Sequence, residues 1–300
     1  MTNKDFTVSV CSITYGHEAF IGKMIEGVLN QECEYPFEFI ILDDNSPDQT
    51  ELVVENIQNR IPNDFRIRYI KNDVNLGVIP NFIKALKQCK GKYILFCEGD
   101  DFWNDKKKIQ KQVDFLEKEV GYVGCYHNVC VVDAHNHILK ASKSSKLYNR
   151  DISQEELKKG FTISLSSICF RNVITEFPEE FNKTNLGDKF LCSLLGHHGP
   201  VKFLKEIEPS AYRFHSGGVW SEKSALDKEK AYVNSHYWMW QYYQRIGNKD
   251  LSDYFFKLIL KKGYLSSPFN KRGYTVMDKL EYLSLWLLRR TFRVLRYIFR

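Results

Sequence analysis

The feature that most constrains the fold is a regular alternation of strand-like and helix-like segments over the first hundred residues. Short apolar runs of strand length are separated by segments whose apolar residues recur at helical spacing, as from Phe20 to Leu29. This order is typical of an α/β fold, in which a mostly parallel sheet carries helices on both faces. The expected strands cover residues 7–14, 37–42, 65–69 and 93–97.

Two acidic clusters follow expected strands. Asp43 and Asp44 come directly after one strand, and residues 98–101 (Glu-Gly-Asp-Asp) come directly after another. Ligands of such sheets bind outside the carboxyl ends of the strands. We therefore expect both clusters to lie in one crevice, although they are far apart in the sequence.

The chemistry of residues 98–101 favours a divalent cation. Several carboxylates at one strand end repel each other unless a cation offsets them. Oxygen ligands suit Mg²⁺ or Mn²⁺, which proteins often hold through one or two carboxylates plus substrate phosphates. Gly99 would let a ligand or metal approach the backbone. The alternative is a solvated acidic turn before the helix expected to begin near Asn104.

The second cluster also has two interpretations. Ser46, Pro47 and Gln49 fit an N-cap, a first helical position and a capping box, so Asp43 and Asp44 could simply belong to a turn before a helix. The cap explains Ser46 but not two adjacent aspartates. A buried carboxylate here could instead accept a hydrogen bond from a nucleobase N–H.

Composition narrows the class of protein. The net charge is +6, and much of the excess positive charge lies near the end of the sequence. Five arginines occur from Arg289 onward, and no acidic residue follows Glu281. This uneven distribution argues against a general nucleic-acid binder. The eight cysteines form no C-x-x-C pair, so we expect free thiols in a reducing compartment. The first residues lack the apolar segment of a secretory signal, and we expect a cytoplasmic body.

Residues 280–300 predict a basic amphipathic helix. Its apolar stripe includes Leu288, Phe292 and Leu295, and arginines occupy the adjoining stripe. The arginines argue against a transmembrane helix. The pattern favours peripheral, in-plane binding to an anionic membrane surface, with docking on the protein's own body or a dimer contact as the alternative.

Five segments in a fixed order carry a family resemblance. They are residues 8–15 (VSVCSITY), 39–46 (FIILDDNS), 75–77 (NLG), 91–94 (GKYI) and 98–103 (EGDDFW). In this order they resemble the family 2 glycosyltransferases with the GT-A fold. The resemblance covers roughly residues 6–220 and is densest up to Trp103.

The resemblance implies inverting transfer of a sugar from a UDP-like donor to a saccharide or lipid-linked acceptor, in cell-surface polysaccharide assembly. Tyr15 would pack near the base and Asp44 would hydrogen-bond it, while Arg213 would pair with phosphate. The implied donor-binding residues are Thr14, Tyr15, Asp43, Asp44, Asp100 and Arg213. The implied ligands of Mn²⁺ or Mg²⁺ are Asp101, Asp100 and His215, and His215 could equally be a hydrogen-bonded scaffold residue.

Two departures from the family pattern concern Gly16 and Glu98. Gly16 stands where the family usually has asparagine, so any contact made by that asparagine is absent. Glu98 stands where many members have aspartate, and its role is unassigned.

Asp188 is the candidate general base. Inversion needs one group that takes the acceptor's proton. Gly187 and Asp188 open an expected helix that ends near Leu195, and they are similar to the acceptor-side Gly-Asp of the family. The alternative is an aspartate favoured in the first turn of a helix by the helix dipole.

Other function classes fit less well. A sugar nucleotidyltransferase or a Rossmann dehydrogenase would need a glycine-rich phosphate loop after the first strand, and residues 14–18 do not form one. A non-catalytic nucleotide-sugar-binding or scaffold protein is the remaining alternative. We expect a transferase domain over 1–220, with a nucleotide-binding half (1–104) and an acceptor half (105–220), and a helical extension over 221–300. The sequence leaves the oligomeric state and the donor sugar open.

Overall fold

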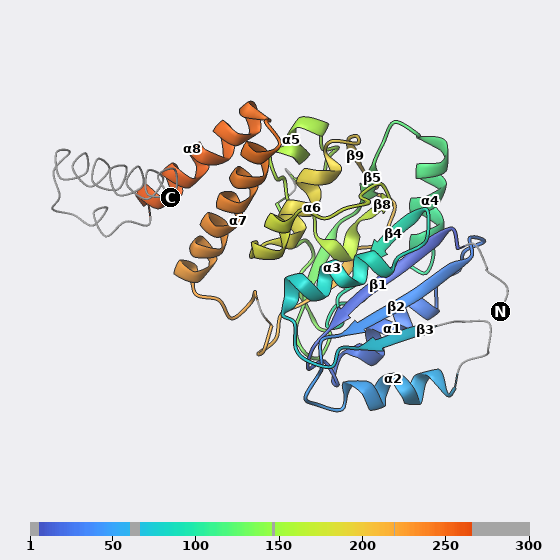
Figure 1. Cartoon of the computed structure of the whole chain (residues 1–300). Helices are drawn as coiled ribbons and strands as arrows, with labels where there is room; N and C mark the ends of the chain where they lie inside the picture. Colours follow the sequence, from blue (N-terminus) through green and yellow to red (C-terminus); the bar gives the residue numbers. More distant parts are fainter. Residues whose placement is uncertain (1–5, 61–66, 146–147, 219, 266–300) are drawn as a thin grey trace.

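The computed structural model describes residues 6–60, 67–145, 148–218 and 220–265 (Figure 1). The expected amphipathic segment 280–300 lies outside these residues. The fold is of the expected α/β class, with a mostly parallel main sheet flanked by helices and a helical carboxyl-terminal region. The main sheet has seven strands in the order β3-β2-β1-β4-β8-β5-β9, and a separate sheet has three in the order β10-β6-β7.

The first four strands are those that the sequence predicts. β1 (Val8–Thr14) pairs in parallel with β2 (Phe37–Asp43) on one side and with β4 (Tyr93–Phe96) on the other, and β3 (Ile67–Lys71) extends the sheet beyond β2. The chain moves outward from β1 to β3 and then returns to place β4 beside β1. Such a reversal opens a crevice at the carboxyl ends of the two strands. The connecting helices are α1 (Ile21–Leu29), α2 (Thr50–Gln58) and α3 (Val78–Gln88).

The second half adds short strands of both directions. β8 (Cys169–Arg171) lies antiparallel between β4 and β5 (Gly124–Tyr126), and β9 (Val201–Phe203) pairs in parallel with β5. The smaller sheet contains β6 (Val129–Val132), β7 (Ile138–Lys140) and β10 (Ser210–Arg213). The helices of this half are α4 (Lys108–Lys118), α5 (Gln154–Lys158) and α6 (Gly187–Leu195), with the 3₁₀ helices η2 (Leu165–Ser167) and η3 (Glu179–Lys183).

Residues 122–132 form two strands in different sheets, because the chain leaves the main sheet at His127 and Asn128. Residues 161–170 are mainly irregular or 3₁₀. One local expectation is wrong. Helix α2 begins at Thr50, so Ser46 is not its N-cap; the Ser46 hydroxyl instead donates to Asp43 Oδ1 over 2.7 Å.

Two apolar layers cover the faces of the main sheet. Val8 and Val10 of β1 pack in one cluster with buried residues of α1, α2 and α4. Cys11 and Ile13, which point the other way, pack in a second cluster with α3 and α6. This alternation follows from the two-residue period of a strand. β1 is buried on both faces, and its polar residues Ser9, Ser12 and Thr14 are small side chains that are buried with the apolar ones.

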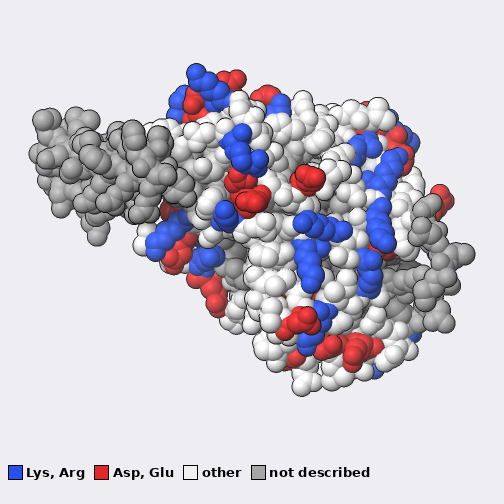
Figure 2. Space-filling view, viewed as in Figure 1, with Lys and Arg blue, Asp and Glu red and all other residues white. Residues whose placement is uncertain are grey.

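The carboxyl-terminal helices α7 (Ala225–Arg245) and α8 (Lys249–Leu265) are fastened to the second layer. The Tyr243 hydroxyl lies 2.7 Å from Ser193 Oγ of α6, and its ring stacks on Phe255 of α8 with centroids 5.6 Å apart. Arg245 donates two hydrogen bonds to the Glu180 carboxylate, at 2.7 and 2.9 Å. Basic and acidic side chains are interspersed over the face shown in Figure 2. Among the described residues, no helix has both the length and the apolar character needed to cross a membrane.

Candidate functional site

The acidic turn Glu98–Asp101 lies at the reversal point of the sheet, where β1 and β4 end. The Gly99 N–H donates to the Ile13 carbonyl over 3.0 Å, and the Asp101 N–H donates to the Glu98 carbonyl over 3.0 Å. A Cβ on Gly99 would lie 2.6 Å from Thr14 Oγ1 and 2.7 Å from His17 Nδ1. The sequence suggested that this glycine admits a ligand or metal; the structure shows that it admits two side chains of the protein.

Asp101 has the geometry of a cation ligand. Its side chain is 1% exposed; Oδ1 accepts the Arg213 N–H over 3.0 Å, whereas Oδ2 is buried and has no hydrogen-bond partner among the described residues. Burial, with the negative charges of Asp100 and Glu98, raises the pKa of Asp101 well above its ordinary value. A divalent cation would offset these charges and satisfy the unpaired oxygen. The donor set therefore fits Mg²⁺ or Mn²⁺.

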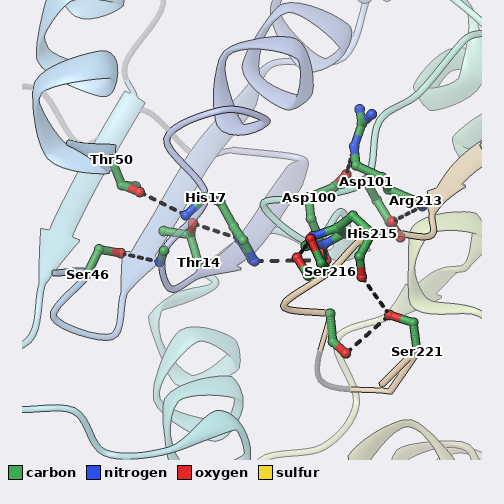
Figure 3. Close-up of polar contacts among 12 residues, drawn as sticks. Thr14, His17, Ser46, Thr50, Asp100, Asp101, Arg213, His215, Ser216 and Ser221 are labelled. Atoms are coloured by element: carbon green, nitrogen blue, oxygen red, sulfur yellow. Dashed lines mark hydrogen bonds and ion pairs between the residues drawn. The ribbon is translucent and has the colours of Figure 1, made fainter. Parts of the chain in front are cut away.

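Two histidines converge on Asp100 (Figure 3). His215 Nε2 lies 3.2 Å from Asp100 Oδ2, and His17 Nε2 lies 3.9 Å from the same oxygen. Burial opposes ionisation of Asp100, but the hydrogen bond from His215 and the charge of His17 hold its pKa below the ordinary value. The hydrogen bond to Asp100 in turn raises the pKa of His215. In this arrangement the His215 ring contacts the Asp100 carboxylate.

His17 is a site residue that sequence reasoning missed. Its Nδ1 lies 3.1 Å from Thr14 Oγ1, and its backbone N–H donates to Thr50 Oγ1 over 3.0 Å. The available signal was its position just after Thr14, Tyr15 and Gly16, in the loop that follows the first strand. Its contact with Asp100 joins segments more than eighty residues apart, which no local pattern reveals.

Arg213 is bound to the protein on all sides. Its side chain is almost fully buried between the Phe20 and Phe102 rings, whose centroids lie 4.6 and 5.3 Å from Cζ. Nε donates to the Asp100 carbonyl over 2.8 Å, and Nη2 donates to Asn136 Oδ1 over 2.9 Å. Together with its backbone bond to Asp101, these contacts make Arg213 a brace for the acidic turn. Pairing with a phosphate would require Arg213 to give up protein contacts.

The second acidic cluster adjoins the same loop. The Asp44 N–H donates to the Thr14 carbonyl over 2.9 Å, and the Gly16 N–H donates to Ser46 Oγ over 3.0 Å. Asp43 Oδ1 accepts from the Ser46 N–H over 2.8 Å, and its Oδ2 accepts from the Tyr69 hydroxyl. The 14–17 loop thus contacts both acidic clusters, and Figure 3 shows Thr14 and His17 between Ser46 and Asp100.

Asp44 holds the loop that contains the Asn-Leu-Gly segment. Oδ1 accepts from Asn72 Nδ2 over 2.9 Å and from the Leu76 N–H over 2.8 Å, and Oδ2 accepts from the Gly77 N–H over 2.8 Å. The carboxylate is 3% exposed. Since each carboxylate oxygen has two lone pairs, Oδ2 keeps one for a further donor. Tyr15, by contrast, is 48% exposed at the rim.

Asp188 lies in the first turn of α6, partly buried and near the acidic turn. Its Oδ1 accepts from the Lys189 N–H over 2.7 Å. Burial raises the pKa of Asp188, while that N–H and the charge of Lys143 oppose the rise. Its charge also acts on Glu98, whose pKa is raised to about 8, chiefly by burial and then by Asp100. A carboxylate with a raised pKa is better suited to accept a proton than an ordinary one.

The protein alone does not provide a complete metal cage. Over the part of the chain that the structure describes, no three His, Cys, Asp or Glu side chains form a group that could hold a metal ion. Mg²⁺ and Mn²⁺ sites with one or two carboxylates are completed by water and substrate phosphates. Asp101 with Asp100 matches that pattern, and His215 contacts Asp100.

A family model describes most of this region. The model for glycosyl transferase family 2 matches residues 9–176, which is more than half of the chain. An uncharacterized protein of Mycobacterium tuberculosis is 32% identical over 214 residues, covering 71% of this chain and 60% of the relative. The Escherichia coli UDP-Glc:alpha-D-GlcNAc-diphosphoundecaprenol beta-1,3-glucosyltransferase is 36% identical over 112 residues, or 37% of this chain and 42% of that enzyme. The chain thus spans about three fifths or less of these relatives.

Solved structures share the fold. Staphylococcus aureus TarS 1-349 in complex with UDP-GlcNAc has a TM-score of 0.59 at 20% identity, covering 77% of this chain and 66% of that one. A mannosyltransferase from Pyrobaculum calidifontis in complex with GDP-Man and Mn²⁺ has a TM-score of 0.59 at 13% identity, covering 95% and 81%. At these identities the likeness establishes the fold alone, and it confirms the expected architecture.

Proposed function

The chain belongs to glycosyl transferase family 2, and from this membership we propose that it transfers a sugar, with inversion and with a divalent cation, from a nucleoside-diphosphate donor to an acceptor hydroxyl. The donor is proposed to be a UDP-sugar. The acceptor is proposed to be a saccharide or a lipid-linked saccharide, in the assembly of cell-surface polysaccharide. The Escherichia coli relative, by its name, acts on a diphosphoundecaprenol-linked sugar, which supports this acceptor class.

One observation carries the proposal: Asp101 Oδ2 is buried at the sheet reversal, beside Asp100 and Glu98, and has no hydrogen-bond partner among the residues that the structure describes. Such an oxygen is costly in a protein unless a cation or donor meets it. In a transferase the cation would also bind the donor's phosphates. Asp101 Oδ2 would therefore support both the binding of a metal ion and the binding of the donor.

The donor would lie across the carboxyl ends of β1 and β4. Tyr15 is exposed at the rim and can cover the base, and the remaining lone pair of Asp44 Oδ2 can accept a base N–H. Asp43 and Thr14 shape the loop on which Tyr15 lies. Asp100 would face the ribose or the cation. We assign Arg213 to bracing Asp100 and Asp101, since its donors are engaged by the protein.

The transfer would proceed in one displacement. The acceptor oxygen attacks the anomeric carbon while the bond from that carbon to the diphosphate oxygen breaks, and the electron pair leaves with the diphosphate. Asp188 takes the acceptor's proton, for which burial has raised its pKa. When bound, Mn²⁺ or Mg²⁺, held by Asp101 with Asp100 or His215, supplies positive charge to the departing diphosphate. Raised pKa values at Glu98 and Asp101 fit a site made for a cation.

We further propose that the protein works at the cytoplasmic face of a membrane, held peripherally by the basic segment 280–300. That segment lies outside the described residues, so the proposal rests on its sequence pattern.

A thermal-shift panel tests the proposed function. UDP-, GDP- and dTDP-sugars are added with Mn²⁺ and with EDTA, and the melting temperature is recorded. We expect a UDP-sugar to raise it only with Mn²⁺. Stabilisation of equal size in EDTA would contradict a metal-bridged donor. A bound donor that is never consumed, with any saccharide or lipid-linked acceptor supplied, would favour the non-catalytic alternative.

A further inference from the structure

A lysine from outside the main sheet, Lys143, reaches the acidic site. It follows β7, and its backbone N–H donates to the Val129 carbonyl over 2.6 Å. Its Nζ lies 3.3 Å from the centroid of the Tyr212 ring, which is a close cation–π contact. The preceding residue is also tied down, because Ser142 Oγ donates to Asn128 Oδ1 over 2.8 Å. The position of the ammonium is therefore set by the fold on two sides.

The charge of Lys143 acts on the carboxylates of the site. Its positive charge lowers the pKa values of Glu98, Asp101 and Asp188 against the effect of burial. Tyr212, on which the ammonium lies, is in turn surrounded by these acids and Asp100, which with burial raise its pKa. Lys143 thus lies within charge–charge range of both the proposed cation ligand and the proposed base.

The ammonium is close to these acids without being paired to one. Among the described residues, no carboxylate oxygen lies within the 4.0 Å that defines an ion pair with Lys143 Nζ. Lys143 is an exposed residue, so its N–H donors are available to a ligand, while the Tyr212 ring holds the charge in place. The one strong anion that the proposed reaction brings to this space is the donor's diphosphate.

We propose that Lys143 is a further catalytic residue, which donates a hydrogen bond to the β-phosphate of the donor and stabilises it as the leaving group. This inference rests on the proposed function. As the bond from the anomeric carbon to the phosphate oxygen breaks, that oxygen keeps the electron pair, and the lysine N–H offsets the added charge. The acceptor's proton still goes to Asp188, so the step needs no further reactant.

Calorimetric titration of Lys143→Ala tests this role, because binding of UDP should weaken while binding of UMP should not. The variant is titrated with UDP and with UMP in Mn²⁺, and with Mn²⁺ alone; GDP and GMP replace them if GDP is the better ligand of the wild type. Loss of a charged hydrogen bond should weaken UDP binding about tenfold or more and leave UMP binding unchanged, because UMP has no β-phosphate. Mn²⁺ alone should bind at least as tightly, since a competing positive charge is gone.

Lys140→Ala is the matched control, because Lys140 is an exposed lysine at the end of β7, three residues away. It should bind all three ligands like the wild type. Lys143→Ala with wild-type affinity for UDP, or with equal losses for UDP and UMP, would overturn the phosphate contact. Weakened binding of both Mn²⁺ and UDP would also overturn it, since that pattern indicates a disturbed fold. A wild type that binds neither UDP nor GDP would refute the proposed function itself, and this inference with it.

Discussion

At the scale of single residues, the site consists of carboxylates whose ionised form is disfavoured by burial. Asp101 is buried, and one of its oxygens has no hydrogen-bond partner in the described part of the chain, while Glu98 and Asp188 have raised pKa values. Asp100 differs, because two histidines face it. We propose that these carboxylates have three different roles: cation ligand for Asp101, base for Asp188 and hydrogen-bond acceptor for Asp100. Environment, and not residue type, decides which role each acid is given.

Asp188→Asn should keep donor binding and lose transfer. The amide cannot take a proton, so we expect the transfer rate to fall about 10²- to 10⁴-fold. The thermal shift with donor and Mn²⁺ should match that of the wild type. Asp250→Asn is the control, because Asp250 is also an acid in the first turn of a helix, α8, away from the site. If Asp188→Asn turns over at the rate of the control, Asp188 is not the base, and its position is explained by the helix dipole alone.

Glu98 should make the metal-free protein less stable as pH rises. Its pKa is about 8 in the folded chain, against 4.5 as the ordinary value. Between these values the native state binds more protons than the unfolded state, so the free energy of unfolding falls with rising pH. In EDTA, the melting temperature of the wild type should fall more steeply than that of Glu98→Gln between about pH 5 and about pH 8. Parallel curves would show that Glu98 ionises normally.

Local sequence patterns reached only part of the site. Asp101 and Asp188 could be proposed from short segments, because Asp101 follows a strand end and Asp188 belongs to a Gly-Asp pair that resembles the family pattern. His17 and Lys143 could not, because each gains its meaning from partners in distant segments, His17 at Asp100 and Lys143 at Tyr212. The burial of Arg213 between two aromatic rings could not be predicted either. Phe20 precedes α1 and Phe102 follows the acidic turn, so both are far from Arg213 in the sequence.

At the scale of elements, the site residues lie where strands end and where a helix begins. β1 and β4 bring Thr14 and Glu98 to one edge, and the first turn of α6 brings Asp188. The sequence predicted these elements well because each has a clear apolar period. It placed the start of α2 wrongly because Ser46 is engaged by Asp43 and Gly16, a contact between segments. Strands of three residues, such as β5 and β8, are too short to show a period.

Gly91→Ala should strongly destabilise the sheet. Gly91 precedes β4, and a Cβ there would lie 2.5 Å from the backbone of both Val8 and Ser9. Backbone atoms in a central strand cannot move aside, so we expect a loss of about 3 kcal/mol in the free energy of unfolding, measured by urea denaturation. Gly121→Ala is the control, with nothing within 4 Å of the added carbon. Equal midpoints for the two variants would contradict this packing.

At the scale of the whole molecule, the transferase region and the carboxyl-terminal helices share a core. Tyr243 and Phe255 belong to the same apolar cluster as α3 and α6. The alternation of strands and helices in the first hundred residues was enough to predict a mostly parallel sheet with helices on both faces, but not the order of its strands. The docking of α7 on α6 could not be predicted, because the aromatic residues of α7 do not indicate their partners.

The basic segment should decide membrane binding. In flotation with vesicles rich in anionic lipid, we expect the full chain to rise with the vesicles and a chain ending at residue 273 to stay below, because the positive charges near the end are then gone. Neutral vesicles should float neither protein. Equal recovery of both proteins with anionic vesicles would show that the basic segment does not determine membrane binding.

Calorimetric titration of donor nucleotide into the wild type and Asp101→Ala, each in Mn²⁺ and in EDTA, tests the central claim most directly. The nucleotide is whichever of UDP and GDP the thermal-shift panel selects, and Asp253→Ala, an exposed acid on α8, is the control. We predict that Mn²⁺ tightens binding to the wild type and the control by about tenfold or more and leaves Asp101→Ala unaffected. Binding by the wild type that is the same in Mn²⁺ and in EDTA would contradict a metal bridge between Asp101 and the donor.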